Sequence, residues 1–462
     1  MKRCALQLLL LAVLTSSAAW GQINCATGST ASAKLVCEFP VSTGVLANST
    51  ALGNSPSQSQ VSSAQGDATG VATALNVAIA AQLSQLPLAA ASAGTVVAYK
   101  NGVQETFNNL GPILVDRAQT VGKERTFLGF TASQYVFTDI DSQPLRKLPF
   151  SYYRTACPAG STGCTPSNAV STTYTSEITS ASFVVNQFVV VATVGMTSRL
   201  DISLIVPITR VSVGAAVPQP TSNNYIVSNG SYFEAAGPTS NNRGAASGIG
   251  DVEFGGKYAL YVGEHTTLSA GSIFRTPSGA ALNFLGSGAW GFNPFLAYSY
   301  LSNFSPHAKI GYQWNTASQL NNPTYINPIN SVTTSLCGTV VCQPNKPLPG
   351  GVQYDVGADW AAGKRFTVAA DLIGNQYLNT YRIVTSPSST CVLSTGSSGQ
   401  CTLLIPPTTS LQSSSYSLSD LSTGVKWNPA LSLVFSANLL TQLNNNGMRA
   451  RPTPLLGIAY KF

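Results

Sequence analysis

The chain has 462 residues, of which 44% are hydrophobic and only 9% are charged, and its formal net charge is +7. A typical soluble protein has about 25% charged residues, so this composition is unusual for a chain surrounded by water. The basic residues are scattered and form no run that could follow a phosphate backbone, which argues against nucleic-acid binding. After the N-terminus no stretch offers about 20 strongly apolar residues, so transmembrane helices are not expected.

Residues 1–21 have the pattern of a secretory signal peptide. Lys2 and Arg3 form a positive start, an apolar run follows, and Ala19-Trp20-Gly21 is a small-x-small cleavage site. The apolar run is too short to span a bilayer. We therefore expect export and a mature chain that begins at Gln22.

The sequence predicts an N-terminal segment over residues 22–110, which precedes a second domain over 111–462. Apolar residues recur in it at helical spacing: Val71, Leu75, Ile79 and Leu83. A short strand is expected over 95–107. The helix either plugs the lumen of the domain that follows or packs below it in the periplasm, and the sequence leaves both open.

The second domain contains a series of segments in which apolar and polar residues alternate, as they do in β-strands. They are expected at 123–139, 173–195, 198–214, 249–262, 265–277, 290–302, 305–317, 350–362, 364–382, 413–427, 430–444 and 450–462. Short and long connections alternate between them, as periplasmic turns and outer loops do in a transmembrane barrel. The predicted fold is all-β, an outer-membrane β-barrel of about twelve antiparallel strands. Fourteen strands stay open if 95–107 and another segment join the wall, and a soluble all-β protein is the runner-up.

The final strand ends on an aromatic residue. Leu456, Ile458, Tyr460 and Phe462 form one apolar row of this strand. A terminal aromatic in an alternating strand is typical of bacterial outer-membrane barrels, where it lies in the interfacial girdle. We expect the barrel-assembly machinery to bind the strand that ends at Phe462, and outer-membrane lipid to surround the barrel.

The charged residues of the strands are candidates for the lumen lining, because charge that faces lipid costs about 2–4 kcal/mol at the midplane. These candidates are Asp201, Asp251, Glu253, Lys257, Lys309, Asp355, Asp359, Arg365 and Asp371. One interpretation is a salt-bridge network that stiffens the barrel. The other is a mixed-charge lining that tunes permeation.

The cysteines after Cys4 fall into four couples that are close in sequence. The couples are Cys25 with Cys37, Cys157 with Cys164, Cys337 with Cys342, and Cys391 with Cys401. In an oxidising envelope such couples predict short-range disulfides, and the last three lie in expected outer loops. A zinc site would need histidines beside them, and the chain has only two. No metal and no cofactor are expected.

The positions of these two histidines argue against catalysis. His265 and His307 both begin strands after short turns, so both are expected to be solvated at the periplasmic rim. A barrel hydrolase needs a histidine that activates a serine in the outer half. The sequence therefore predicts that the protein is not an enzyme.

Four segments together resemble the outer-membrane family named for the MetA pathway of phenol degradation. They are residues 199–207, 248–258, 285–294 and 424–429, within a resemblance that covers roughly 110–462. The resemblance implies a channel-like barrel linked to small aromatic or hydrophobic compounds, and it brings no catalytic or ligand residues. The function expected is passive uptake of such a small-molecule solute across the bacterial outer membrane. The alternatives are a structural or adhesive surface barrel and, less favoured, a barrel lipid hydrolase.

Overall fold

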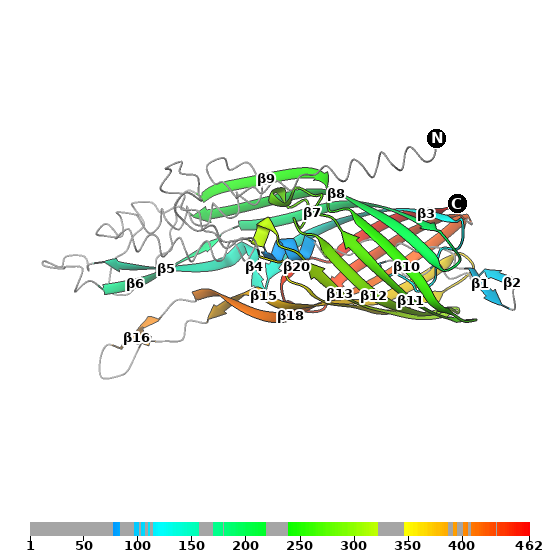
Figure 1. Ribbon diagram of the computed structural model, residues 1–462. Coiled ribbons are helices and arrows are strands. Elements are labelled where there is room, and N and C mark those ends of the chain that lie inside the picture. Colours follow the sequence, from blue (N-terminus) through cyan, green and yellow to red (C-terminus); the bar gives the residue numbers. More distant parts are fainter. Residues whose placement is uncertain are drawn as a thin grey trace, which may run out of the picture.

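The computed structural model describes residues 77–83, 97–100, 103–106, 110, 114–156, 170–178, 180–218, 239–321, 346–386, 391–394, 401–404, 408–430 and 432–462. Its main body is a closed barrel of twelve antiparallel strands (Figure 1), which confirms the predicted fold class. The expected signal peptide lies outside the described residues.

Most of the expected disulfides also lie outside the described residues. This holds for three couples, namely Cys25 with Cys37, Cys157 with Cys164, and Cys337 with Cys342. Their pairing therefore stays a prediction from sequence spacing. The fourth couple, Cys391 and Cys401, belongs to two short paired strands that are named below.

The twelve strands of the wall follow one another in chain order. They are β3 (Thr126–Ile140), β7 (Ser180–Gly195), β8 (Leu200–Pro218), β10 (Glu253–Val262), β11 (Thr266–Arg275), β12 (Gly291–Tyr300), β13 (Phe304–Asn315), β14 (Gly351–Ala361), β15 (Phe366–Ser386), β18 (Thr408–Ala430), β19 (Leu433–Gln442) and β21 (Thr453–Lys461). Each strand pairs with the next, and β21 pairs with β3 through registers such as Ile458 opposite Phe130. The chain is therefore an up-and-down barrel without a free edge around its ring.

The remaining elements are short or lie beside the wall. The strands are β1 (Val97–Lys100), β2 (Val103–Thr106), β4 (Gln143–Pro144), β5 (Leu148–Ala156), β6 (Val170–Ile178), β9 (Thr239–Ile249), β16 (Cys391–Ser394), β17 (Cys401–Leu404) and β20 (Met448–Ala450). The 3-10 helices are η2 (Leu145–Lys147), η3 (Ala281–Asn283) and η4 (Gln319–Asn321), and residues 77–83 are α-helical. In the described part of the chain, no helix is long and apolar enough to cross a membrane.

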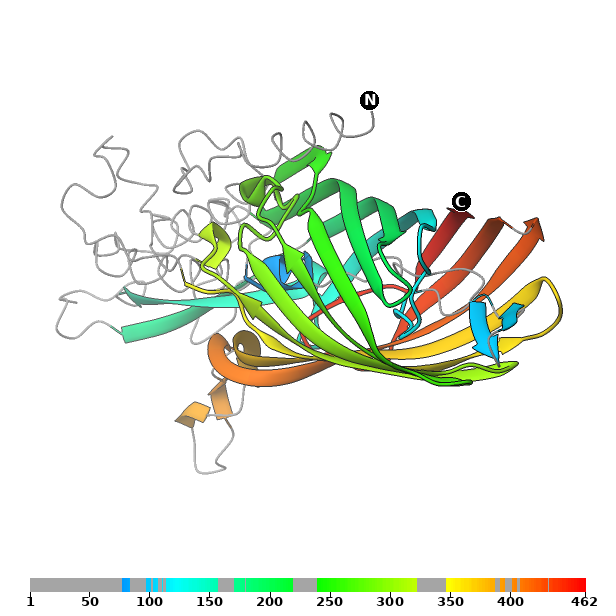
Figure 2. The ribbon, with the colours of Figure 1, turned by 45° about the vertical axis from the view of Figure 1, so that its right-hand side comes forward.

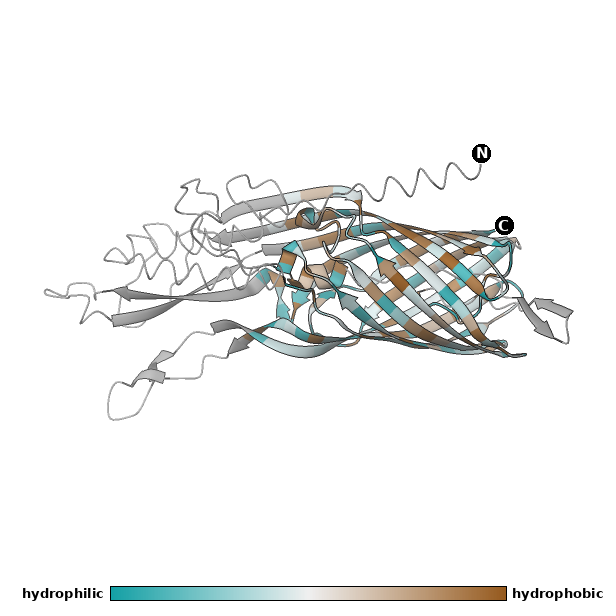
Figure 3. Ribbon diagram, viewed as in Figure 1, coloured by the Kyte–Doolittle hydropathy of each residue, from teal (hydrophilic) through white to brown (hydrophobic). Residues whose placement is uncertain are grey.

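The outer surface of the wall is apolar between two levels of aromatic side chains. The rings of Phe366 and Trp427 stack at the end with the short turns, while Phe292 and Trp314 stack towards the other end. Phe304 and Trp314 lie ten positions apart on β13. That spacing is about 33 Å along the strand and about 25 Å along the axis of a tilted barrel. Figure 3 shows brown, hydrophobic positions repeating along this wall. The barrel therefore spans the bacterial outer membrane.

Three expected strands differ in detail. The segment 173–195 contains two strands, β6 and β7, and 249–262 is broken at residues 250–252 into β9 and β10. The first part of β8, residues 200–205, pairs with β10, and its later part, residues 208–218, pairs with β9. The segment 95–107 contains β1 and β2, which form a two-stranded sheet of their own. The fourteen-stranded alternative is therefore wrong.

The break between β9 and β10 coincides with contacts made by Asp251 to the connection 276–290. Asp251 turns out of the ladder and accepts hydrogen bonds from the backbone N–H groups of Gly279 (3.0 Å) and Ser287 (2.7 Å) and from the Ser287 hydroxyl (2.6 Å). A charge-assisted bond of this kind is roughly twice as strong as a neutral one. The carboxylate thereby fixes the connection 276–290 against the wall.

Candidate functional site

The candidate site is the barrel lumen, which is crossed by a segment that precedes β3. We call Leu110 and residues 114–121 the strap. Most of its residues are buried inside the barrel, and Arg117 and Ala118 have exposed fractions of 2% and 0%. Residues 114–121 of the strap belong to the part of the chain that the sequence assigns to the barrel, yet they lie inside the ring of strands rather than forming part of it.

The strap runs from one side of the ring to the other. At its start, the Leu110 N–H donates to the Thr367 hydroxyl of β15 (3.0 Å). At its end, the Val121 N–H donates to the Asp201 carboxylate of β8 (2.9 Å). In the order of the ring, β15 and β8 are separated by the same number of strands in both directions. The strap therefore spans the full width of the lumen.

Basic side chains of the wall hold the backbone of the strap. Lys257 of β10 donates to the Arg117 carbonyl (2.7 Å) and contacts the Asp116 carboxylate (3.2 Å). Lys426 of β18 donates to the Leu110 carbonyl (3.2 Å). Buried carbonyls need such partners, because an unsatisfied polar group costs about 1–3 kcal/mol. The wall thus supplies the hydrogen bonds that the irregular backbone of the strap lacks.

The side chain of the strap residue Arg117 joins a buried group of charges. Its Nη2 atom lies 2.5 Å from Oδ2 of Asp359 on β14. His307 of β13 lies between two carboxylates, with Nδ1 3.2 Å from Asp359 and Nε2 2.8 Å from Asp371. We call Arg117, Asp359, His307 and Asp371 the charge cluster. All four side chains are almost completely buried.

The position of His307 differs from the sequence prediction. His307 is 3% exposed, whereas the sequence predicts a solvated side chain at the rim. The cause is strand register: β13 begins at Phe304, so His307 falls on the inward row, with Gly357 and Asp371 beside it on the next two strands. The neighbours of both ring nitrogens are acceptors, which suits an imidazole that carries both hydrogens. His265, by contrast, lies at a turn and is partly exposed.

The other sequence-derived candidates are spread over the wall. Asp201, Lys257, Asp359 and Asp371 are buried near the strap, as described above. Lys309 lies opposite Asp355, and its Nζ atom is 4.7 Å from the centre of the Phe295 ring.

The remaining three candidates do not lie with the charge cluster. Asp251 holds the connection 276–290, and Glu253 is paired in register with Arg275. Arg365 is exposed in the turn between β14 and β15. The structure thus brings some of the nine together around the strap and leaves others at different levels.

The lumen beyond the strap, towards the long connections, is filled by apolar side chains. The helical turn 77–83 places Ile79 and Ala80 there against barrel residues such as Phe137 and Phe183. Figures 1 and 2 both show this blue helix within the ring of strands. Phe284, from the connection 276–290, packs edge-on against Phe183 with ring centres 5.9 Å apart. An apolar layer and the polar strap therefore occupy the lumen in series.

Sequence reasoning missed two members of the site. Arg117 lies in a stretch without strand or helix periodicity, so nothing local placed it in the lumen. Lys426 was detectable, since it lies between the outward residues Val425 and Trp427 of an alternating strand. A charged residue at such a position faces inward for the same reason as the predicted candidates.

Residues 160–339 match the family model described as the MetA-pathway of phenol degradation, which confirms the resemblance expected from the sequence over that stretch. No curated protein matches the chain.

Among solved structures, the chain is similar to the COG4313 outer membrane channel from Pseudomonas putida F1. The identity is 11% and the TM-score 0.40, over 75% of this chain and 98% of that one. It is also similar to the toluene transporter TbuX from Ralstonia pickettii. There the identity is 10% and the TM-score 0.32, over 74% of this chain and 90% of that one.

Proposed function

We propose that the protein is an outer-membrane channel for small aromatic or hydrophobic molecules, with a lumen gated by the strap and narrowed further by the helical turn 77–83. The observation that carries this proposal is the strap, which crosses the barrel between opposite strands and is held by side chains of the wall. A purely structural barrel could fill its lumen with apolar side chains and would not need a polar segment across it.

The polar contacts of the strap suit a gate. Hydrogen bonds contribute about 0.5–1.5 kcal/mol each, and those to charged groups about 1.5–3 kcal/mol. Contacts of this size can be exchanged for water without disturbing the hydrogen-bonded ring of strands. Displacement of the strap would open the inner half of the lumen, and passage would then follow the concentration gradient of the solute.

The solute class rests on two supports. The matched family is described by phenol degradation, which is the chemistry of a small aromatic compound. In the outer half of the lumen, aromatic residues face inward, among them Phe137, Phe183 and Phe284. Aromatic surfaces favour aromatic partners by about 0.5–1.5 kcal/mol beyond the area that they bury.

The proposal includes no chemical step. The ring nitrogens of His307 face the carboxylates of Asp359 and Asp371 rather than a hydroxyl group. Such an arrangement stabilises buried charge and offers no nucleophile. For assembly, we propose that the barrel-assembly machinery binds β21, where Tyr460 packs against the exposed ring of Phe462 at 4.7 Å.

The test is conductance in planar bilayers, with the protein refolded from its mature chain. Three proteins are compared: the wild type, a variant that lacks residues 22–93, and a variant that combines this deletion with Arg117→Ala. Lys123→Ala is the control, because Lys123 is exposed just outside the strap. We expect few openings in the wild type and the control, and the most frequent openings in the combined variant, because the apolar layer and the strap lie in series. Closed traces in every correctly folded variant would contradict the proposal and favour the structural or adhesive barrel.

A further inference from the structure

The outward face of the wall changes from apolar to polar in one step across five neighbouring strands. One outward row contains Leu456, Ala132, Phe188, Ile208 and Ile249. The next outward row contains Gln134, Asn186, Arg210 and Ser247. This polar row lies on the side of the long connections, since β3 continues beyond it to residue 140 and the connection that follows. Arg210 is ten positions from the start of β8, as Trp314 is from the start of β13, so the polar row lies near the level of the outer aromatic side chains. Beyond it the outward positions are mixed, with Val136 opposite Val184.

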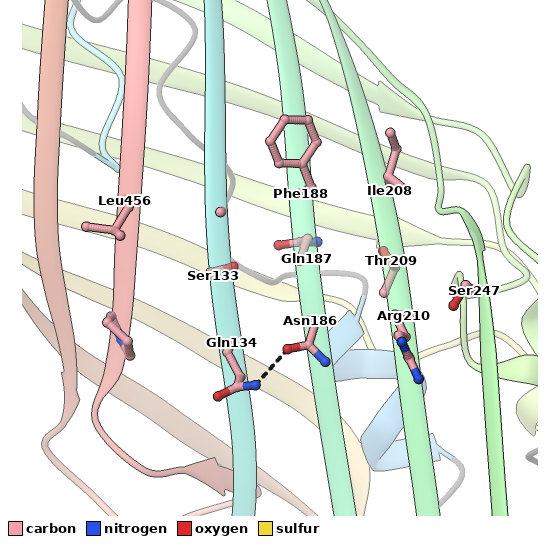
Figure 4. A pocket seen from close by; sticks show the side chains of 12 residues that line it. Ser133, Gln134, Asn186, Gln187, Phe188, Ile208, Thr209, Arg210, Ser247 and Leu456 are labelled. Atoms are coloured by element: carbon pink, nitrogen blue, oxygen red, sulfur yellow. Dashed lines mark hydrogen bonds between the residues drawn. The ribbon is translucent and has the colours of Figure 1, made fainter.

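A depression lies at this step on the outside of the barrel. Its volume is about 500 Å³, and Figure 4 shows the side chains that line it. Phe188, Ile208 and Leu456 form its apolar part and are all more than a third exposed. Gln134, Asn186 and Arg210 form its polar part.

The polar part presents hydrogen-bond donors. Gln134 donates its amide N–H to Oδ1 of Asn186 at 2.7 Å. The amide nitrogen of Asn186 is consequently turned the other way, towards Arg210, as Figure 4 shows. Asn186 and Arg210 are opposite each other in the register of β7 and β8. An amide N–H and a guanidinium therefore lie side by side.

Arg210 is the one charged residue of the polar row. It is exposed, and within the described residues no carboxylate forms an ion pair with its guanidinium. A guanidinium presents its donors in a planar fork that matches a phosphate. An arginine here lies at the depth where lipid headgroups begin, next to apolar side chains that suit an acyl chain.

We propose that this depression binds a phosphate-bearing lipid of the outer leaflet. The phosphate accepts hydrogen bonds from Arg210 and Asn186, and an acyl chain lies along Phe188, Ile208 and Leu456. The lipid is held on the outside of the wall, so this site does not depend on the channel function. Charge complementarity and the step between the two rows together favour a lipid over a free anion.

The experiment is native mass spectrometry of the folded full-length mature protein in a neutral detergent. The probes are dilauroyl phosphatidic acid, dilauroylglycerol (which has the same chains without the phosphate) and inorganic phosphate. The variants are Arg210→Gln and Phe188→Ala. Arg199→Gln is the matched control, because Arg199 is an exposed arginine at the other end of β8.

We expect the wild type and Arg199→Gln to bind phosphatidic acid about tenfold more tightly than dilauroylglycerol. Arg210→Gln should lose this preference, and Phe188→Ala should weaken binding of phosphatidic acid severalfold. Equal binding of the two lipids, or unchanged binding by Arg210→Gln, would overturn the proposal. So would complete displacement of the lipid by millimolar inorganic phosphate, which would indicate a site for free anions. Both substituted residues face outward, and gel mobility before and after heating verifies that each variant is folded.

Discussion

Arg117 and Asp359 form a buried ion pair although they are 242 positions apart in the sequence. The pair connects the strap to β14, and His307 joins it from β13. The strap and the wall are thus parts of one electrostatic arrangement. Removal of the ion pair between Arg117 and Asp359 should therefore affect stability as well as permeation.

The first prediction concerns this ion pair. Arg117→Met and Asp359→Asn each remove one partner of a buried ion pair, which costs about 3–5 kcal/mol, with the loss for Arg117→Met at the lower end because His307 remains beside Asp359. The double variant should be less destabilised than the sum of the two single variants, with a coupling energy of about 2 kcal/mol. Urea unfolding of the four proteins in lipid vesicles measures this coupling. Simple additivity would mean that the pair contributes nothing to holding the strap.

The second prediction separates the two histidines. His307→Phe removes the group that lies between two buried carboxylates, so we expect a loss of about 3 kcal/mol in the free energy of unfolding. His265→Phe is the matched control, and because that side chain is partly exposed at a turn the change should stay within about 0.5 kcal/mol. The urea midpoints of both variants check this. Equal losses of unfolding free energy in His307→Phe and His265→Phe would show that burial of His307 between two carboxylates does not matter for stability.

The third prediction uses a pair of glycines. A Cβ at Gly286 would collide with the carboxylate of Asp251, whereas a Cβ at Gly256 meets nothing within 4 Å. Gly286→Ala should therefore cost about 1–3 kcal/mol, because the connection 276–290 must shift away from Asp251. Gly256→Ala should stay within about 0.5 kcal/mol. Proteolysis of the folded proteins adds a local measurement, since faster cleavage within 276–290 is expected for Gly286→Ala alone.

The fourth prediction concerns the couple formed by Cys391 and Cys401. The two residues lie on β16 and β17, which pair as antiparallel strands, with Cys391 opposite Leu404 and Cys401 opposite Ser394. This register puts the two cysteines at opposite ends of the short sheet, so a disulfide between them requires β16 and β17 to shift. We still predict the disulfide in the exported protein from sequence alone, because the couple is close in sequence and the envelope is oxidising. Peptide mapping by mass spectrometry without reduction should find one cross-linked peptide. Two free, alkylated cysteines in freshly exported protein would refute it.

The same peptide map tests the other predicted disulfides. Spacing alone pairs Cys25 with Cys37, Cys157 with Cys164, and Cys337 with Cys342, and all six residues lie outside the part of the chain that the structure describes. Each couple should give its own cross-linked peptide, because short-range pairing joins neighbours in the sequence. A cross-link between cysteines of different couples would contradict the assignment of one disulfide to each loop.

The wall of the barrel is the part that the sequence predicts well. Alternation such as that of Leu200 and Asp201 assigns each side chain to lipid or lumen, because charge is costly in lipid. This information is local, so the sequence predicts all twelve strands, with ends that differ by a few residues. Even the inward position of Lys426 follows from the same rule.

The contents of the lumen are not predictable in the same way. Arg117 has no periodic neighbours, and its partner Asp359 comes from a distant strand. The break at Asp251 depends on Gly279 and Ser287, which follow a full strand later. The prediction for His307 is wrong because its position relative to the end of a turn decides whether it faces inward. Each of these features arises from contacts between segments, which a single sequence does not display.

The position of the strap in the chain constrains how the protein forms. Its wall partners lie on β8, β10, β12, β14, β15 and β18, all of which come later in the sequence. The ring closes only when the last strand, β21, meets β3, directly after the strap. The strap is therefore enclosed as the wall grows around it rather than threaded into a finished cylinder. The barrel therefore closes around a lumen that is already occupied, and no step of insertion into an open pore is required.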